Sequence, residues 1–340
     1  NLLSGLKMSA GGKTLDWERD PLDPYAFKLQ VPAGVRMLDL EFEHLGPVSP
    51  MSGRVIVTRE MLNVQWNSVV LYPAGYMAKN IQVRPTLVLP AGWQAGTALR
   101  PEKQDGAAIQ YRPVTLEMLV DSPVFAGRNF RRIELDPPGT PRPVVLNLVA
   151  DSADKLNPTE PQIEAHRELV RQADKAFGSR HYNHYDFLLA ISDELGGIGL
   201  EHHQSSENGV RTNYWDNWER RPGSRELLPH EYTHSALNCP GDDDALFGAS
   251  GPGHGAPLPN QRLDDGSHLL MTSHSFPWEQ NSPEKPNGTL CHSVLGEMLP
   301  VGESCYGYLG TAVCPEVWAH AEGCWDLSNQ HDASRSSQPC

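Results

Sequence analysis

Apolar residues in the first 150 positions recur in short runs, and one of these runs has a clear period of two. Leu38, Leu40 and Phe42 alternate with polar residues. Because successive side chains of a strand point to opposite faces, this alternation predicts a β-strand. Further short runs occur at residues 55–57, 69–72, 87–89 and 144–149, with turns rich in proline and glycine among them. The pattern predicts an antiparallel, sandwich-like all-β domain over residues 1–155.

Three aromatic residues of this region, Trp66, Tyr72 and Trp93, have two interpretations. They either belong to the buried core of the sandwich or form a face that binds sugars or peptides. We favour the buried core, and no cluster of titratable residues stands out in this part of the chain.

After residue 157 the hydrophobic pattern becomes that of a helix. Thr159 and Gln162 have the spacing of a capping box, and Gly178 follows the last apolar position. The apolar residues that share one face of this helix are Ile163, Leu169, Val170, Ala173 and Phe177. The sequence therefore predicts a helix that begins after Thr159 and ends at Gly178.

The following segments continue the order helix, strand, strand, helix. The apolar run 187–191 predicts a buried strand, and a glycine-rich segment at 196–209 follows it. A second helix is expected to begin near Pro229, because proline suits the first helical position. This order predicts an α+β catalytic domain, of which residues 156–235 form the N-terminal part, behind the all-β domain.

Two histidines four residues apart in the second helix define a candidate metal site. Residues i and i+4 project from the same face, so the imidazoles of His230 and His234 can reach one tetrahedral Zn²⁺. Glu231 can take a proton from the attacking water and give it to the leaving amine while zinc polarises the carbonyl. The motif points to peptide-bond hydrolysis. The alternative is that both histidines are ordinary polar residues of an amphipathic helix.

Several separate segments carry a resemblance to one family. They are NVQWNSVVLYPAGY, HYDFLLAISDE, GGIGLEHHQSSENG and LLPHEYTHS, and they occur in the family's order at compatible spacings. Over about residues 2–235 the chain resembles the glycyl aminopeptidase family of zinc metallopeptidases. The resemblance implies an N-terminal β-sandwich joined to a thermolysin-like catalytic domain of the gluzincin kind. It also implies a preference for peptides with a small N-terminal residue such as glycine.

The resemblance assigns roles to particular residues. It places the first two zinc ligands at His230 and His234 and the general base at Glu231. It places a substrate-binding strand at Gly199 and Glu201, where the Glu201 carboxylate would face the free amine of the peptide. A charge-assisted hydrogen bond of this kind is strong, and a solvated acid at a strand end is the other interpretation of Glu201.

The segment after residue 235 departs from the family. It holds all six cysteines and no isoleucine, and 13 of the 42 acids but three of the 28 basic residues. The helix that carries the family's third zinc ligand is missing, and the nearest acids, Asp264 and Asp265, stand in a turn-like sequence. We expect residues 236–340 to be a poorly ordered tail from a shifted reading frame or an alternative exon. The zinc site is then expected to be incomplete and the chain inactive.

Charge and hydropathy limit the partners. A net charge of -14 without a basic run argues against nucleic acid, and no stretch reaches the ~20 apolar residues that span a membrane. We expect a soluble protein with a peptide substrate and no membrane partner. Asn1 is not expected to be the encoded start, and a lost leader would place the protein in the periplasm or outside the cell. The competing function is a catalytically dead module that binds peptides by strand addition.

Overall fold

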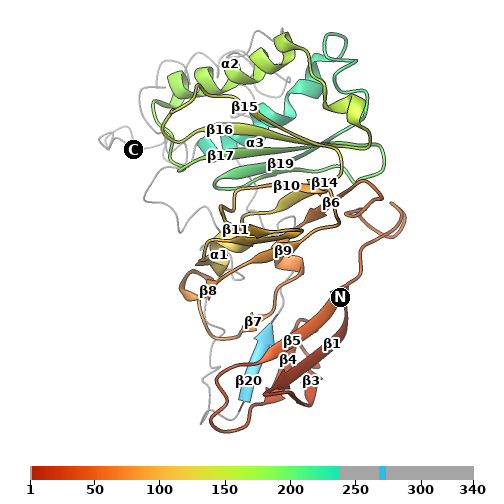
Figure 1. Cartoon of the computed structure of the whole chain (residues 1–340), viewed down its shortest axis with the longest axis vertical. Helices are drawn as coiled ribbons and strands as arrows, with labels where there is room; N and C mark the ends of the chain where they lie inside the picture. Colours follow the sequence, from red (N-terminus) through yellow and green to blue (C-terminus); the bar gives the residue numbers. More distant parts are fainter. Residues whose placement is uncertain (1, 237–267, 273–340) are drawn as a thin grey trace, which may run out of the picture.

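The computed structural model describes residues 2–236 and 268–272 of the 340-residue chain. Figure 1 shows an elongated arrangement, with a five-stranded sheet and its helices at one end and the strands nearest the N-terminus at the other. Strands and helices are both present, and most of the small sheets are antiparallel. The predicted α+β class is therefore confirmed.

The N-terminal part consists of several small antiparallel sheets. The first pairs β2 (Lys13–Thr14), β1 (Leu3–Ala10) and β5 (Asp39–His44). A second combines β3 (Trp17–Arg19), β4 (Ala26–Gln30), β20 (His268–Thr272) and β7 (Tyr72–Pro73). The sequence predicts no regular element after residue 236, whereas the backbone of β20 pairs with both β4 and β7. The expectation of a poorly ordered tail over residues 236–340 stays a prediction, and these five residues form a strand.

Three further sheets lie in the middle of the molecule (Figure 1). Their strands, in sheet order, are β10 (Gln94–Thr97), β14 (Val124–Gly127) and β6 (Met61–Val64); β11 (Pro101–Asp105), β12 (Ala108–Tyr111) and β9 (Thr86–Val88); and β13 (Val114–Thr115) and β8 (Gln82–Val83). The short helices are α1 (Leu116–Val120), η1 (Trp66–Ser68), η2 (Ala78–Asn80), η3 (Ala153–Leu156) and η4 (Pro222–Arg225). Thr115 caps α1 by accepting a hydrogen bond from the Met118 N–H.

The predicted strands have mixed outcomes. The runs at 38–42, 87–89 and 144–149 correspond to β5, β9 and β16 (Val144–Ala150). The run at 55–57 is not a strand, because only Val57 makes an isolated bridge there. The run at 69–72 contributes only its last residue to β7. Both failures are short apolar runs, and periodicity alone does not show whether such a run finds a strand partner.

The three aromatic residues belong to the interior. Trp66 packs against two hydrophobic clusters of the middle sheets and donates its indole N–H to the Ser122 carbonyl at 2.9 Å. Tyr72 and Trp93 are also half-buried against these clusters. The packing supports the core interpretation, because the apolar faces of these rings contact other side chains.

The five-stranded sheet at the other end has the order β15 (Phe130–Glu134), β16, β17 (Tyr185–Ile191), β19 (Ser205–Val210) and β18 (Gly199–Glu201). The central strands β16, β17 and β19 are parallel, and both outer strands pair antiparallel. The predicted boundary at residue 155 separates β15 and β16 from their partner β17. That boundary stays a prediction, and the pairing favours a position before Phe130.

Both faces of this sheet are covered, which explains the continuous apolar runs of its strands. On one face Tyr185, Phe187, Leu189 and Ile191 of β17 pack with the helices, and on the other Leu188 and Ala190 meet Met61 and Phe125 of the middle sheet. Strands buried on both faces read as unbroken hydrophobic segments. Figure 1 shows α2 above the sheet and β10, β14 and β6 below it.

Helix α2 (Glu160–Phe177) agrees with its sequence prediction. The Thr159 N–H donates to Gln162 Oε1 at 2.7 Å, and Gly178 ends the helix in the left-handed conformation with a φ of 70°. Four of the five predicted apolar positions are buried, and Phe177 is half-buried against the same cluster. The helix is thus fixed by local capping signals together with one buried stripe.

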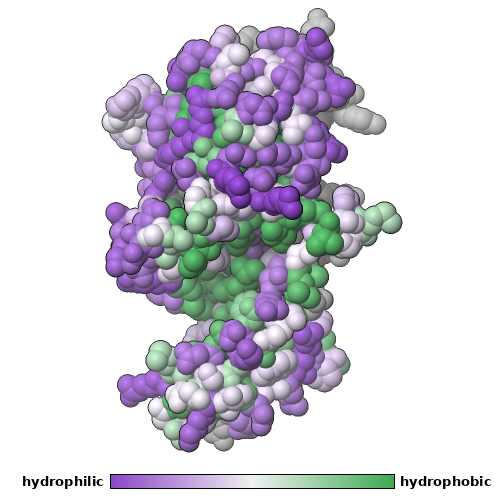
Figure 2. Space-filling view, turned by 45° about the vertical axis from the view of Figure 1, so that its right-hand side comes forward, coloured by the Kyte–Doolittle hydropathy of each residue, from purple (hydrophilic) through white to green (hydrophobic). Residues whose placement is uncertain are grey.

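Hydrophobic surface gathers in the middle of the molecule in Figure 2, between two more polar ends. The large exposed apolar side chains of the described residues include Leu45, Val48, Met51, Val57, Tyr76, Met77 and Val88. Contiguous apolar surface is typical of a face that packs against another protein surface. Among the described residues no helix is long and apolar enough to cross a membrane.

The buried imidazole of His166 makes the stability of this fold dependent on pH. His166 lies on α2 and is buried against Trp215 and Trp218. This burial lowers the pKa of His166 to about 4, although its hydrogen bond with the Gln162 carbonyl opposes the shift. The unfolded state binds the proton first, so stability is full above pH 6.5 and falls as pH decreases toward 4. We expect a loss of about 2 kcal/mol between pH 7 and pH 5 from this residue. Urea unfolding of wild type and His166→Leu at both pH values measures it, and an equal pH dependence of the two proteins contradicts it.

Candidate metal centre

The candidate metal-binding residues lie on α3 (Leu227–Ala236). The helix begins two residues before the predicted start, and its first backbone bond runs from the His230 N–H to the Glu226 carbonyl at 2.9 Å. Pro229 is tolerated in the first turn because the N–H groups there have no partner within the helix. The sequence thus located this helix correctly to within two residues.

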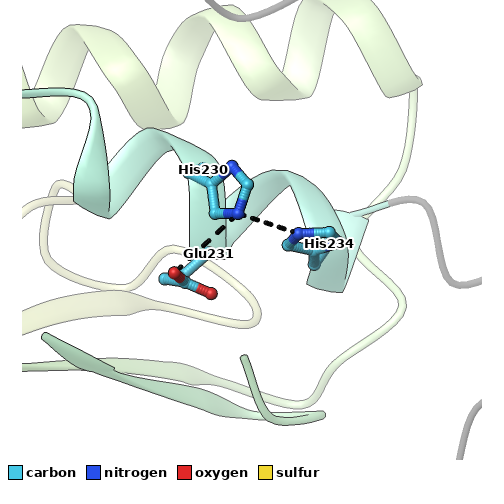
Figure 3. A group of neighbouring side chains, drawn as sticks. All are labelled: His230, Glu231 and His234. Carbon is cyan, nitrogen blue, oxygen red and sulfur yellow. Dashed lines mark hydrogen bonds and ion pairs between the residues drawn. The ribbon is translucent and has the colours of Figure 1, made fainter. Parts of the chain in front are cut away.

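The structure brings His230, Glu231 and His234 together on one side of α3, as Figure 3 shows. The two Nε2 atoms of His230 and His234 are 3.1 Å apart. The Glu231 carboxylate lies 4.0 Å from His230 Nε2 and is buried. One candidate ligand atom from each of the three residues lies within 4.8 Å of the others. Among the described residues this is the one group of three or more such side chains that could hold a metal ion.

These donors fit a zinc ion in chemistry and spacing. Two ligands at the usual Zn–N distance of a tetrahedral site are about 3.3 Å from each other. The observed 3.1 Å between the two Nε2 atoms is close to that value. Imidazole nitrogen is a preferred zinc ligand, and a neighbouring carboxylate is the usual base of such a site. The arrangement could therefore supply two ligands and one base.

Aromatic packing fixes the helix against the sheet. Tyr232 is buried on the side of α3 that faces β17, where its ring meets Tyr185 at 4.8 Å and Phe187 at 5.1 Å between centroids. Its hydroxyl also bonds to that of Tyr182. Burial raises the pKa of Tyr232 well above its ordinary value, so both hydroxyls stay protonated. This contact orients the histidine-bearing side of α3 away from the sheet core.

Gly199 lies directly against the general-base candidate. A Cβ at this position would be 2.6 Å from Glu231 Oε1 and 2.6 Å from Leu227 Cδ1. Such distances are well inside van der Waals contact, so a side chain at this position would require the ends of the Glu231 and Leu227 side chains to move. The sequence assigned Gly199 to substrate binding by resemblance. The structure adds a steric reason for the residue.

Glu201 stands at the end of β18, two residues after Gly199, and also borders the site. Its Oε1 is 4.0 Å from His234 Nδ1, and about a quarter of its side chain is exposed. A partly exposed carboxylate beside the metal candidates is suited to meet a charged group of a ligand. The structure thus brings all five predicted site residues into one region, three on α3 and two on β18.

A buried network next to Glu201 was not found from the sequence. His202 Nδ1 lies 3.1 Å from Asp121 Oδ1, and its Nε2 lies 3.1 Å from Glu207 Oε2. Asp121 is 81 residues away along the chain, so no local pattern links the pair. The pair of histidines in GLEHH is the only sequence signal, and it does not separate a buried histidine from an exposed one.

The acids nearest the position expected for a third ligand cannot be placed. Asp264 and Asp265 lie outside the described residues, and so do all six cysteines. Among the residues that the structure does describe, the metal group has two imidazoles and one carboxylate. The expectation that the site lacks a third protein ligand therefore stays a prediction.

The fold of this chain is similar to that of a solved aminopeptidase-type structure. A crystal structure of an aminopeptidase N family protein from Idiomarina loihiensis matches 69% of this chain with a TM-score of 0.55 and 17% sequence identity. This chain spans 39% of the length of that relative. An M1 zinc metallopeptidase from Deinococcus radiodurans matches 73% of this chain and 62% of its own, at 14% identity and a TM-score of 0.38. The second score is too low to support an argument, so the first carries the likeness in fold.

The sequence is more specific about the N-terminal part. Residues 1–128 match the family model of the Peptidase M61 N-terminal domain, where M61 is the glycyl aminopeptidase family. No curated protein sequence is significantly similar to the chain. The resemblance to the glycyl aminopeptidases is therefore confirmed over the N-terminal domain.

The contact between Gly199 and Glu231 leads to a prediction. Gly199→Ala should push the Glu231 carboxylate away from β18 and lower the free energy of unfolding by about 1 kcal/mol, because both neighbouring atoms are side-chain ends that can move. The matched control is Gly197→Ala, whose Cβ would meet nothing within 4 Å. Urea unfolding and a crystal structure of each variant test this. Equal stability of the two variants with Glu231 in its original place would refute it.

Proposed function

We propose that the protein catalyses zinc-dependent peptide hydrolysis of the aminopeptidase type, with a preference for a small N-terminal residue such as glycine. The observation that carries the proposal is the 3.1 Å separation of the two Nε2 atoms of His230 and His234 beside the buried Glu231 carboxylate. The match to the M61 N-terminal domain supports it, because that family consists of glycyl aminopeptidases. The middle and N-terminal sheets then form the β-sandwich part, and the five-stranded sheet with α2 and α3 forms the start of a gluzincin-type catalytic domain.

The residues have separate roles in this reaction. His230 and His234 hold the zinc ion, which supplies Lewis acidity to the substrate carbonyl and the attacking water. Glu231 accepts a proton from the water and passes it to the leaving nitrogen. Burial on the site side of α3 and contact with Gly199 hold its carboxylate in place. Glu201 accepts hydrogen bonds from the peptide's free ammonium group, which restricts the reaction to the end of the peptide.

A second candidate function is a catalytically dead module that binds peptides along β18. The specific observation in its favour is the ligand set, since the described residues offer two imidazoles and one carboxylate that is needed as a base. A catalytic zinc site ordinarily has three protein ligands. Hydrolysis of a glycyl peptide by the purified zinc-loaded chain supports the enzyme. Binding of the same peptide without hydrolysis supports the module.

Replacing the base separates chemistry from metal binding. Glu231→Gln should lower the hydrolysis of a glycyl peptide at least 100-fold, because it removes the proton acceptor and leaves both imidazoles in place. Zinc content, measured by atomic emission, should not change. Glu219→Gln, a change at an exposed acid, is the control and should retain both properties. Activity of Glu231→Gln within tenfold of wild type would exclude this residue as the base.

Removing a ligand should have the opposite effect on the metal. His234→Ala leaves one of the two facing imidazoles, so we expect zinc to be lost on dialysis and hydrolysis to disappear with it. The matched control is His44→Ala on β5, which lies in the first N-terminal sheet and should retain zinc. Equal zinc content in the two variants after dialysis contradicts the assignment.

A further inference from the structure

The short strand β18 carries two of the proposed site residues. It has three residues, lies at the edge of the five-stranded sheet and pairs with β19 on one side. Edge strands this short have few backbone bonds to fix them. The position of Glu201 therefore depends on what anchors the residues before and after β18.

The end after Glu201 is anchored by His202, which uses every hydrogen-bonding group that it has. Its Nδ1 meets Asp121 and its Nε2 meets Glu207, each at 3.1 Å. Its backbone N–H donates to the Ser205 carbonyl at 2.9 Å. Its own carbonyl accepts a hydrogen bond of 2.8 Å from the Ser235 hydroxyl. Ser235 directly follows His234 on α3.

The charges of this network require a protonated imidazole. A neutral ring has one N–H, whereas both ring nitrogens of His202 face carboxylate oxygens, so both must donate. Burial opposes the charge, but the hydrogen bonds to Asp121 and Glu207 outweigh it and raise the pKa of His202 to about 10. The side chain is 5% exposed, so these are charge-assisted bonds away from water.

The network joins β18 to the N-terminal part of the chain. Glu207 also accepts bonds from Asn63 Nδ2 at 2.6 Å and from Gln65 Nε2 at 3.0 Å. Asp121 follows α1 and accepts a further bond from the His203 N–H at 3.0 Å. His202 thus connects the middle sheets, the edge strand and α3 through one side chain and one carbonyl.

The other end of β18 is anchored by the same part of the chain. The Gly196 N–H donates to the Val55 carbonyl at 2.8 Å, and Arg54 Nε donates to the Gly196 carbonyl at 3.3 Å. A Cβ on Gly196 would be 2.5 Å from Arg54 Cγ, so this contact is close as well. Both ends of β18 are therefore tied to residues that precede the catalytic part of the sequence.

We propose that His202 is a positioning residue that clamps β18 between Asp121, Glu207 and Ser235 and so holds the Glu201 carboxylate beside His234. The inference rests on the proposed role of Glu201 in binding the peptide's free amine. It assigns the N-terminal part a direct share in substrate recognition, because Asp121, Asn63 and Gln65 fix the clamp from outside the five-stranded sheet.

The experiment uses the full zinc-loaded chain and the variant His202→Gln. The matched control is His166→Gln, which also removes a buried histidine but lies on α2, away from β18. Two measurements are made: hydrogen exchange of the backbone amides of residues 197–203, and the dissociation constants of glycyl-alanine and of N-acetyl-glycyl-alanine. Zinc content is measured in each protein.

We expect His202→Gln to speed exchange in this segment at least tenfold. The substitution should raise the dissociation constant of glycyl-alanine about tenfold and that of the acetylated peptide less than twofold. Zinc content should not change. The control should leave exchange at residues 197–203 and both affinities within twofold of wild type. If His202→Gln does not fold, Asp121→Asn provides the same test, because it keeps the shape of the side chain and removes one charge. A smaller change in the same direction is expected.

The outcomes separate this inference from the proposed function. Unchanged exchange in residues 197–203 overturns the clamp, and equal weakening of both peptides overturns its link to Glu201. If the wild-type chain binds the free and acetylated peptides equally, the proposed role of Glu201 fails. The exchange measurement then still decides whether His202 holds β18.

Discussion

Burial of β17 on both faces is the constraint on which the rest of the structure depends. One face of the strand needs α2 and α3, and the other needs Met61 and Phe125 of a sheet formed earlier in the chain. The buried Asp186 of β17 reinforces this second contact, because Arg100 binds its carboxylate at 2.9 Å. The approach is close enough that a Cβ on Gly96 would be 2.6 Å from Asn147 Cβ. The N-terminal and catalytic parts therefore share one interior, and neither face of the strand can be exposed without a large loss of buried apolar area.

The candidate site lies at the edge of that interior, between α3 and β18. Tyr232 occupies the buried side of α3, and this leaves His230, Glu231 and His234 on the side that faces β18. The absence of a side chain on Gly199 leaves room for the Glu231 carboxylate between the strand and the helix. The packing of α3 against the sheet therefore also sets the distance between the candidate metal ligands on α3 and the Glu201 carboxylate on β18. A helix and a strand hold such a constellation more exactly than loops would.

Features with local causes could be predicted from the sequence, and features with distant partners could not. The capping box at Thr159, the apolar run of β17 and the spacing of the two α3 histidines are all contained in a few consecutive residues. By contrast, Val55 to Val57 reads as a strand but has no extended partner, and β20 pairs with strands nearly 200 residues or more away. The bond between His202 and Asp121 spans 81 residues, and the steric role of Gly199 appears only when β18 and α3 are placed together.

The orientation of the His234 ring separates the roles of the two glutamates. Its Nε2 faces His230 Nε2 at 3.1 Å, so a metal held by both imidazoles would bind on that side of the ring. Glu201 faces the other nitrogen, Nδ1, at 4.0 Å. A carboxylate on the Nδ1 side does not ligate a metal bound through Nε2, although carboxylates in that place commonly orient the histidine. In the proposed function Glu201 is therefore available to meet the peptide amine or to orient His234. With Glu231 assigned as the base, the described residues supply two of the three protein ligands that a catalytic zinc site ordinarily has.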